Sequence, residues 1–263
     1  MTRGSVTTVK RQDYQPIYEK RRRRHKRWRR LGALVLTLLV IGLGVWGWRT
    51  WQSYQQARLA RYPIHGVTIN QDSGYLDFQQ LAKNNQFVYI QATSGATYSD
   101  NDFSNNYSRA QGAEIKVGVM HTFSFSTSAS RQIHHFGQTV GQQTGTLPIM
   151  IAVSYYDQYN SSNRDMAAQG QKLKKIVTAL ADTYRQGVVI YANKTVLTQF
   201  VRPVLPNQAE WMADGHLGHY GSPVKLIEYN ASGKLSQNGQ SQAVGFTVFN
   251  GTQRQWKAFS QQD

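Results

Sequence analysis

The sequence predicts an α/β protein, an irregular (β/α) TIM-like barrel preceded by one transmembrane helix. Three observations lead to this prediction. A charge-free apolar stretch lies near the N-terminus, at residues 31–48. Apolar runs of strand length recur through residues 62–263, and helix-like stretches separate the early ones. Because strands that alternate with helices form parallel β-α-β units, the order favours a mainly parallel sheet.

The apolar stretch has the length of a membrane-spanning helix. Its 18 residues would span about 27 Å as a helix, slightly less than the hydrocarbon core of a bilayer. Trp46, Trp48 and Trp51 lie where an interfacial aromatic belt is expected. The alternative is a cleavable signal peptide with a cut near ARLA, residues 57–60, although bulky tryptophans argue against an earlier cut.

Positive charge is concentrated before this stretch. Residues 1–30 contain 12 Lys or Arg and 2 acidic residues, whereas residues 62–263 contain 15 basic and 12 acidic residues. The positive-inside rule therefore predicts a cytoplasmic N-terminus in the cell membrane and an extracellular C-terminal domain. The predicted division is a basic tail at 1–30, a transmembrane helix at 31–48, a stalk at 49–61 and a barrel at 62–263.

The overall composition excludes several classes of function. The net charge of +16 comes mostly from the tail, which favours a topology signal with some attraction to anionic lipid over nucleic-acid binding. The chain has no cysteine, so thiol chemistry and cysteine-ligated metals are excluded. We expect no cofactor.

Eight predicted strands suit a closed barrel: residues 64–70, 87–93, 115–123, 147–154, 187–193, 209–213, 225–229 and 243–250. The loops between the last three are too short for full helices, so we expect irregularity there. A doubly wound open sheet is the alternative. In a barrel, functional groups are expected at the C-terminal ends of the strands.

Short motifs follow one another through the predicted barrel. In order they are HGVTINQDSG, FVYIQATSG, YSDNDFSNN, IKVGVMHTF, LPIMIAVS, VVIYAN, EWMADG, IEYNASGK and GFTVFNG. This ordered series resembles glycoside hydrolase family 25, the lysozymes or N-acetylmuramidases with an irregular β/α barrel. The resemblance covers nearly all of residues 62–263, and it implies peptidoglycan glycan strands as the partner.

The chain departs from the family at the positions that the resemblance makes catalytic. Five acidic positions of the family hold neutral residues here, namely Thr68, Ser94, Ala152, Ser154 and Gly245. A glycosidase needs a carboxylic acid to protonate the leaving oxygen, and usually a second carboxylate to assist. Since hydroxyl, methyl and hydrogen side chains cannot replace that acid, we predict impaired catalysis. Asp157 and Asp214, each just beyond a predicted strand, are the candidates for compensating acids.

Four residues are candidate sugar contacts at the strand ends: His121, Tyr191, Trp211 and Tyr229. Each also has a structural interpretation, because buried aromatics in strands and hydrogen-bonded histidines are common. We predict no metal site. His134 and His135 are adjacent and point to different sides of a helix, and His216 and His219 lack a third ligand.

Three functions follow from these observations. The first is a membrane-anchored, lysozyme-like domain that binds peptidoglycan or assists envelope assembly, with impaired catalysis. The second is an active N-acetylmuramidase that hydrolyses β-1,4 glycosidic bonds of the cell wall with relocated acids. The third is a scaffold for envelope proteins that no longer binds glycan.

Overall fold

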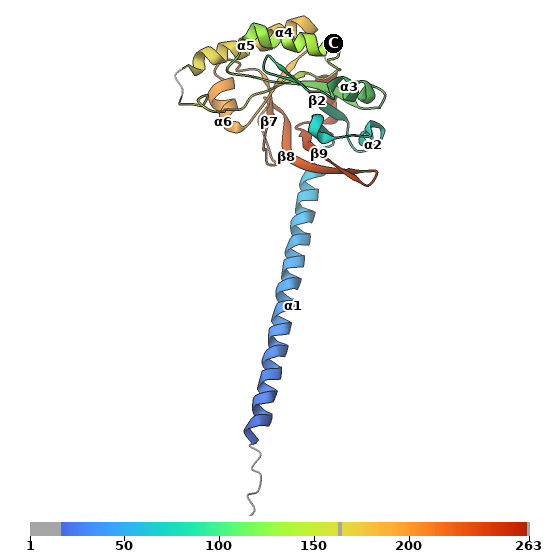
Figure 1. Cartoon of the computed structure of the whole chain (residues 1–263), viewed down its shortest axis with the longest axis vertical. Coiled ribbons are helices and arrows are strands. Elements are labelled where there is room, and N and C mark those ends of the chain that lie inside the picture. Colours follow the sequence, from blue (N-terminus) through green and yellow to red (C-terminus); the bar gives the residue numbers. More distant parts are fainter. Residues whose placement is uncertain (1–16, 163–164, 262–263) are drawn as a thin grey trace, which may run out of the picture. The chain divides into compact units, whose positions relative to one another are not determined.

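The computed structural model describes residues 17–162 and 165–261, which divide into two units after residue 57. A long helix, α1 (Ile17–Leu59), contains the predicted membrane helix and all but the last two residues of the predicted stalk at 49–61 (Figure 1). Within the described residues, one helical segment, Trp28–Leu59, is long and apolar enough to cross a membrane, and its apolar window is fully exposed. A signal sequence would satisfy the same criteria of length and composition. Residues 1–16 of the predicted basic tail lie outside the described residues.

The second unit is built on a closed sheet of eight strands. These are β1 (His65–Ile69), β2 (Phe87–Ser94), β4 (Lys116–Thr122), β5 (Ile149–Ala152), β6 (Val188–Ala192), β7 (Ala209–Met212), β8 (Val224–Gln237) and β9 (Gln240–Phe249). Neighbours from β1 through β8 are parallel, whereas β9 runs antiparallel to both β8 and β1. Because β1 pairs with β2 and with β9, the sheet closes. The predicted eight-stranded barrel is confirmed, and the open-sheet alternative is wrong.

Helices cover only part of this barrel. They are η1 (Gln71–Ser73), α2 (Phe78–Ala82), α3 (Phe103–Gln111), α4 (Ala129–Val140), α5 (Met166–Tyr184), α6 (Lys194–Val196), a π-helical turn η2 (Leu197–Val201) and α7 (Gln253–Ser260). Local capping explains several starts: Asp77 accepts a hydrogen bond from Gln80 N at the start of α2, and Thr252 forms a capping box on α7. Helices α4 and α5 lie side by side (Figure 1). The link from β7 to β8 has no helix, which is the predicted irregularity.

Two apolar layers hold the barrel together. The interior is filled by large rings, with Trp211 packed edge-on against Tyr89 at 4.8 Å and against Phe87 at 6.5 Å between centroids. At the end where β2 begins, Trp256 of α7 lies 5.2 Å from Phe87 and 5.2 Å from Phe249. A second layer packs between the strands and the helices. Burial of such rings stabilises the barrel and closes this end of it.

Strands β8 and β9 continue past the barrel as a hairpin. Their pairing runs from Gly233↔Val244 to Gln237↔Gln240, beyond the residues that pair with β7 and β1. Asn238 and Gly239 connect them with φ of 51° and 76°. Two consecutive left-handed residues, Asn before Gly, are typical of the type I′ turn that matches the twist of paired strands. β3 (Tyr98–Ser99) forms a smaller addition at the end of β2.

Candidate functional site

The strand register gathers the five substituted positions at one end of the barrel. Thr68 of β1 is paired directly with Gly245 of β9. Ser94 of β2 and Ala152 of β5 both pair with Thr122 of the intervening β4. Ser154 follows two residues after Ala152 and is exposed. The positions that the resemblance makes catalytic therefore lie at the end of the barrel where the parallel strands finish, with Gly245 contributed by the antiparallel β9, and we call this end the mouth.

A groove opens at the mouth between β1 and the β8–β9 hairpin. Its volume is about 410 Å³, and its lining includes Thr68, Asn70, Asp72, Met120, Lys234 and Gly245. This lining combines hydroxyl, amide and charged groups with the apolar surface of a methionine. Such a mixture suits a saccharide, whose hydroxyls need polar partners while its ring faces pack on apolar groups.

A buried carboxyl group also lies at the mouth, and the sequence analysis missed it. Glu228 is only 3% exposed, and its Oε2 accepts a 2.5 Å hydrogen bond from the Tyr191 hydroxyl. Burial raises the pKa of Glu228, the Tyr191 donor opposes this, and nearby Asp214 raises the pKa further. Burial and Glu228 together raise the pKa of Tyr191, so this hydroxyl remains a neutral donor. The signal in the sequence was a single acid inside KLIEY, an otherwise apolar strand.

The two candidate compensating acids occupy different surroundings. Asp214 lies in the turn after β7, with φ 50°, and it influences both Tyr191 and Glu228. Asp157 lies exposed in the loop after β5, with φ 49°. Left-handed backbone is common for Asp in turns, which fits the turn interpretation of both residues. Only Asp214 interacts with the buried carboxyl group.

His121 is completely buried beside the mouth. Its Nδ1 accepts from the Thr93 hydroxyl at 2.8 Å, and its Nε2 donates to Gln132 Oε1 at 3.3 Å. Burial lowers the pKa of His121 to about 4, so the ring is neutral at physiological pH. It joins β2 and β4 to α4 and does not reach the groove, so we do not retain it as a sugar contact.

The three aromatic candidates also differ in position. Trp211 is fully buried in the barrel interior and offers no open face. Tyr229 is partly buried and stacks on Phe246 at 6.1 Å, packed against the outer layer. Tyr191 lies at the mouth, where its ring packs on Trp211 and its hydroxyl reaches Glu228. Of the three, Tyr191 alone is connected to the polar groups of the mouth.

Sequence analysis also missed a cluster of rings in the loops after β4 and β5. Phe125 and Tyr159 stack at 5.1 Å, and Tyr156 packs on both. The Tyr156 hydroxyl accepts a 2.9 Å hydrogen bond from Phe125 N, which ties the two loops together. Tyr156 is 36% exposed, so one ring of this cluster is available to a ligand. The SYYDQYN segment carried the signal.

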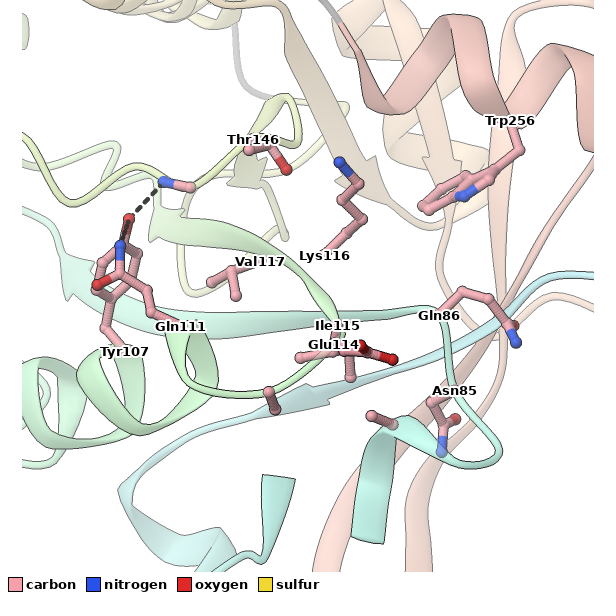
Figure 2. Close-up of a pocket in the computed structure, with 13 residues that line it drawn as sticks. Asn85, Gln86, Tyr107, Gln111, Glu114, Ile115, Lys116, Val117, Thr146 and Trp256 are labelled. Carbon is pink, nitrogen blue, oxygen red and sulfur yellow. Dashed lines mark hydrogen bonds between the residues drawn. The ribbon is translucent and has the colours of Figure 1, made fainter. Parts of the chain in front are cut away.

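A separate cavity lies at the opposite end of the barrel. Its volume is about 520 Å³, and residues that precede β2 and β4, such as Gln86, Glu114 and Ile115, line it together with Trp256 (Figure 2). Strand starts in such barrels generally serve stability. In the described part of the chain no cluster of three or more His, Asp or Glu side chains could hold a metal ion.

Comparison with known proteins agrees with this geometry. The model of the family "Glycosyl hydrolases family 25" matches residues 67–222, which is more than half of the chain. The chain belongs to this family. An uncharacterized Escherichia coli K12 protein, YegX, is 28% identical over 229 residues, which cover 81% of this chain and 79% of that protein. The autolytic lysozyme of Clostridium acetobutylicum is 31% identical over 79 residues, covering 30% of this chain and 24% of that protein.

Solved structures of the family share the fold. A family 25 glycosyl hydrolase from Bacillus anthracis superposes with a TM-score of 0.68 at 26% identity, covering 76% of this chain and 94% of its own. The bacterial lysozyme of Streptomyces coelicolor gives a TM-score of 0.62 at 19% identity, covering 75% and 96%. The mixed α/β fold with a closed eight-stranded barrel is therefore that of family 25 lysozymes, and it supports a domain that acts on peptidoglycan.

Proposed function

We propose that this protein is a membrane-anchored, extracellular member of family 25 that binds the glycan strands of peptidoglycan with little or no hydrolysis. The observation that carries the proposal is the composition of the mouth. Its groove keeps the size and the polar lining that a saccharide needs, while Thr68, Ser94, Ala152, Ser154 and Gly245 supply no acid. Losing a general acid alone costs about 10²–10⁴-fold in rate.

The state of Glu228, the buried carboxyl group that interacts with Tyr191 and Asp214, supports impaired catalysis. Glu228 is held by Tyr191 and is almost completely covered, whereas Asp214 is exposed. A glycosidase usually needs two carboxyl groups that flank the scissile bond, about 5–9.5 Å apart, with room for the sugar between them. Glu228 is almost completely covered and Asp214 is exposed in a turn, so these two carboxyl groups are poorly placed to flank a sugar.

The N-terminal segment supports anchoring and topology. The apolar helix is long enough to span a bilayer, and the basic run before it favours a cytoplasmic N-terminus. In that topology the barrel faces the cell wall. Retention is tested by comparing the mass of the membrane-extracted protein with that of the full chain, since cleavage near residues 57–60 would remove the helix.

Binding is tested with full-length protein in detergent micelles and purified cell walls. Ser232 is exposed and lines the groove, so Ser232→Trp should place a ring in it and weaken pull-down about ten-fold or more. Ser236→Trp is the matched control, because Ser236 is exposed on the same strand outside the groove lining. Equal loss in both variants, or no pull-down by the unchanged protein, would contradict glycan binding and favour an envelope-protein scaffold.

Residual hydrolysis is the second candidate, because Asp214 and Glu228 interact at the mouth. Release of reducing ends from the same cell walls measures it. We expect no release above that of a heat-denatured control. Release that disappears in Asp157→Asn, Asp214→Asn or Glu228→Gln would instead identify an active N-acetylmuramidase with relocated acids.

A further inference from the structure

One oxygen of the buried carboxyl group has no hydrogen-bond donor. Oε2 of Glu228 accepts from Tyr191, and no other donor to this side chain occurs among the residues that the structure describes. The residue as a whole is only 3% exposed, but Oε1 is not one of its fully buried atoms and keeps a small contact with solvent at the mouth. An acceptor that lacks a protein donor and is accessible at the mouth is free to accept a hydrogen bond from water or from a bound ligand.

The position of Oε1 is defined by Gly245. A Cβ atom built on Gly245 would lie 2.7 Å from Glu228 Oε1 and in still closer contact with Thr68 Oγ1. Oε1 therefore occupies the space that a side chain at position 245 would need. Thr68 and Gly245 themselves line the 410 Å³ groove, so this oxygen lies against the wall of that groove.

Tyr191 fixes the orientation of the carboxyl group. Its hydroxyl donates to Oε2 from β6, while Glu228 projects from β8, and Trp211 of the intervening β7 packs against the tyrosine ring. A carboxylate held in this way loses little side-chain freedom when a ligand binds. Hydrogen bonds to an ionised acceptor are also stronger than neutral ones.

We propose that Glu228 Oε1 is the acceptor for a hydroxyl or amide N–H group of one neutral N-acetylhexosamine ring in the mouth groove. This inference rests on the proposed glycan-binding function and deepens it. Glu228 provides from β8 the negative acceptor that β9 lacks at Gly245. The acidic group of the mouth is thus supplied by β8 and serves sugar recognition, and Tyr191 is its positioning residue.

Four charged or titratable groups bear on this acceptor. Tyr191 and Asp214 act on Glu228 directly, and Asp72 and Lys234 are charged residues that line the groove. Since burial raises the pKa of Glu228, acid should protonate Oε1 or Oε2 and remove the ionised acceptor. Affinity should therefore fall as the pH decreases through that raised pKa.

The test uses full-length protein in detergent and a β-1,4-linked trimer of N-acetylglucosamine, with calorimetric titration between pH 4 and pH 8. Glu228→Gln should bind the trimer about 10- to 100-fold more weakly at pH 7, with a flat pH profile. The matched control Glu114→Gln removes an equal charge from the cavity at the opposite end of the barrel and should bind like the unchanged protein (Figure 2).

A second variant separates recognition from folding. Tyr191→Phe keeps the carboxyl group but removes the donor that lowers its pKa, so the midpoint of the pH dependence should move upward. A structural role alone would not move that midpoint. Equal trimer affinity and equal pH dependence in Glu228→Gln and the unchanged protein would overturn the inference while glycan binding stands. Absence of any binding by the unchanged protein to trimer and cell walls would overturn the proposed function itself.

Discussion

The two ends of the barrel are built from different kinds of residue. Where the strands begin, Phe87, Phe249 and Trp256 fill the space with rings at 5.2 Å separations. Where they end, Gly245 leaves room that the carboxyl group of Glu228 occupies. This difference suggests a division of roles. The buried rings where the strands begin stabilise the folded barrel, and this stability offsets the cost of burying Glu228 at the mouth.

The largest loss of stability is expected at the end of the barrel where the parallel strands begin. Trp256→Ala removes a ring that is 5% exposed and contacts Phe87, Phe249 and Phe259. Truncating a buried tryptophan should lower the free energy of unfolding by about 3–5 kcal/mol, measured by urea denaturation. Pull-down of cell walls by the folded fraction should be unchanged. A loss of binding larger than the loss of folded protein would show that the two ends are coupled.

His121, beside the mouth, should make the fold sensitive to acid. Its folded pKa of about 4 lies below the ordinary value of 6.5, so the unfolded state binds a proton first as the pH decreases. Stability is therefore intact above pH 6.5 and should fall by on the order of 3 kcal/mol towards pH 4. Urea denaturation across this range measures it. His121→Gln should lose most of this slope; an unchanged slope would assign the acid sensitivity elsewhere.

A methyl group at the mouth should be destabilising. In Gly245→Ala the new Cβ overlaps Thr68 Oγ1 and Glu228 Oε1, which should cost about 1–3 kcal/mol of unfolding free energy. Adding Thr68→Ala removes the closest atom, so the double variant should recover part of this loss in a double-mutant cycle. Strict additivity of the two changes would contradict the proposed overlap.

The smallest expected change is an increase in the free energy of unfolding, in Glu228→Gln. Because the folded pKa of Glu228 is raised, the folded state holds this proton more tightly, and stability falls as the pH rises through that pKa. Glu228→Gln should then stabilise the protein at pH 7, by about 1.4 kcal/mol for each unit of the shift. The gain should vanish below the unfolded pKa, where both states are protonated. Thermal unfolding of the variant and the unchanged protein, at pH 7 and at a pH below the unfolded pKa, measures this difference.

Sequence patterning predicted the barrel better than the hairpin or the mouth. The eight apolar runs each correspond to a strand, because burial on both faces leaves a strong signal. The extension of β8 and β9 was missed because its exposed residues are polar, although Asn238-Gly239 is a strong hairpin signal. Helix α7 was also missed, since its eight residues bury few apolar side chains.

The contacts within the candidate site could not be predicted from the sequence, because they join residues of strands that are distant along the chain. The order of motifs located the substituted positions, and the register then placed Thr68 opposite Gly245. The role of Glu228 depends on β6, β8 and β9 together, and no spacing along the chain reveals that Tyr191 reaches it. Likewise, Trp211 and Tyr191 both look like exposed strand-end aromatics in the sequence. Only the packing separates a core ring from a residue of the mouth.

The closure of the sheet has a consequence for how the chain acquires its structure. β1 is completed on one side by β2, soon after it in the sequence, and on the other side by β9, which ends at Phe249. Contacts between the first and last strands are formed at the greatest loop-closure cost, and they slow folding. The barrel can therefore close only after β9 has been synthesised. Until then the edges of β1 and β8 are open to mispairing, so a chaperone would protect the chain most during that interval.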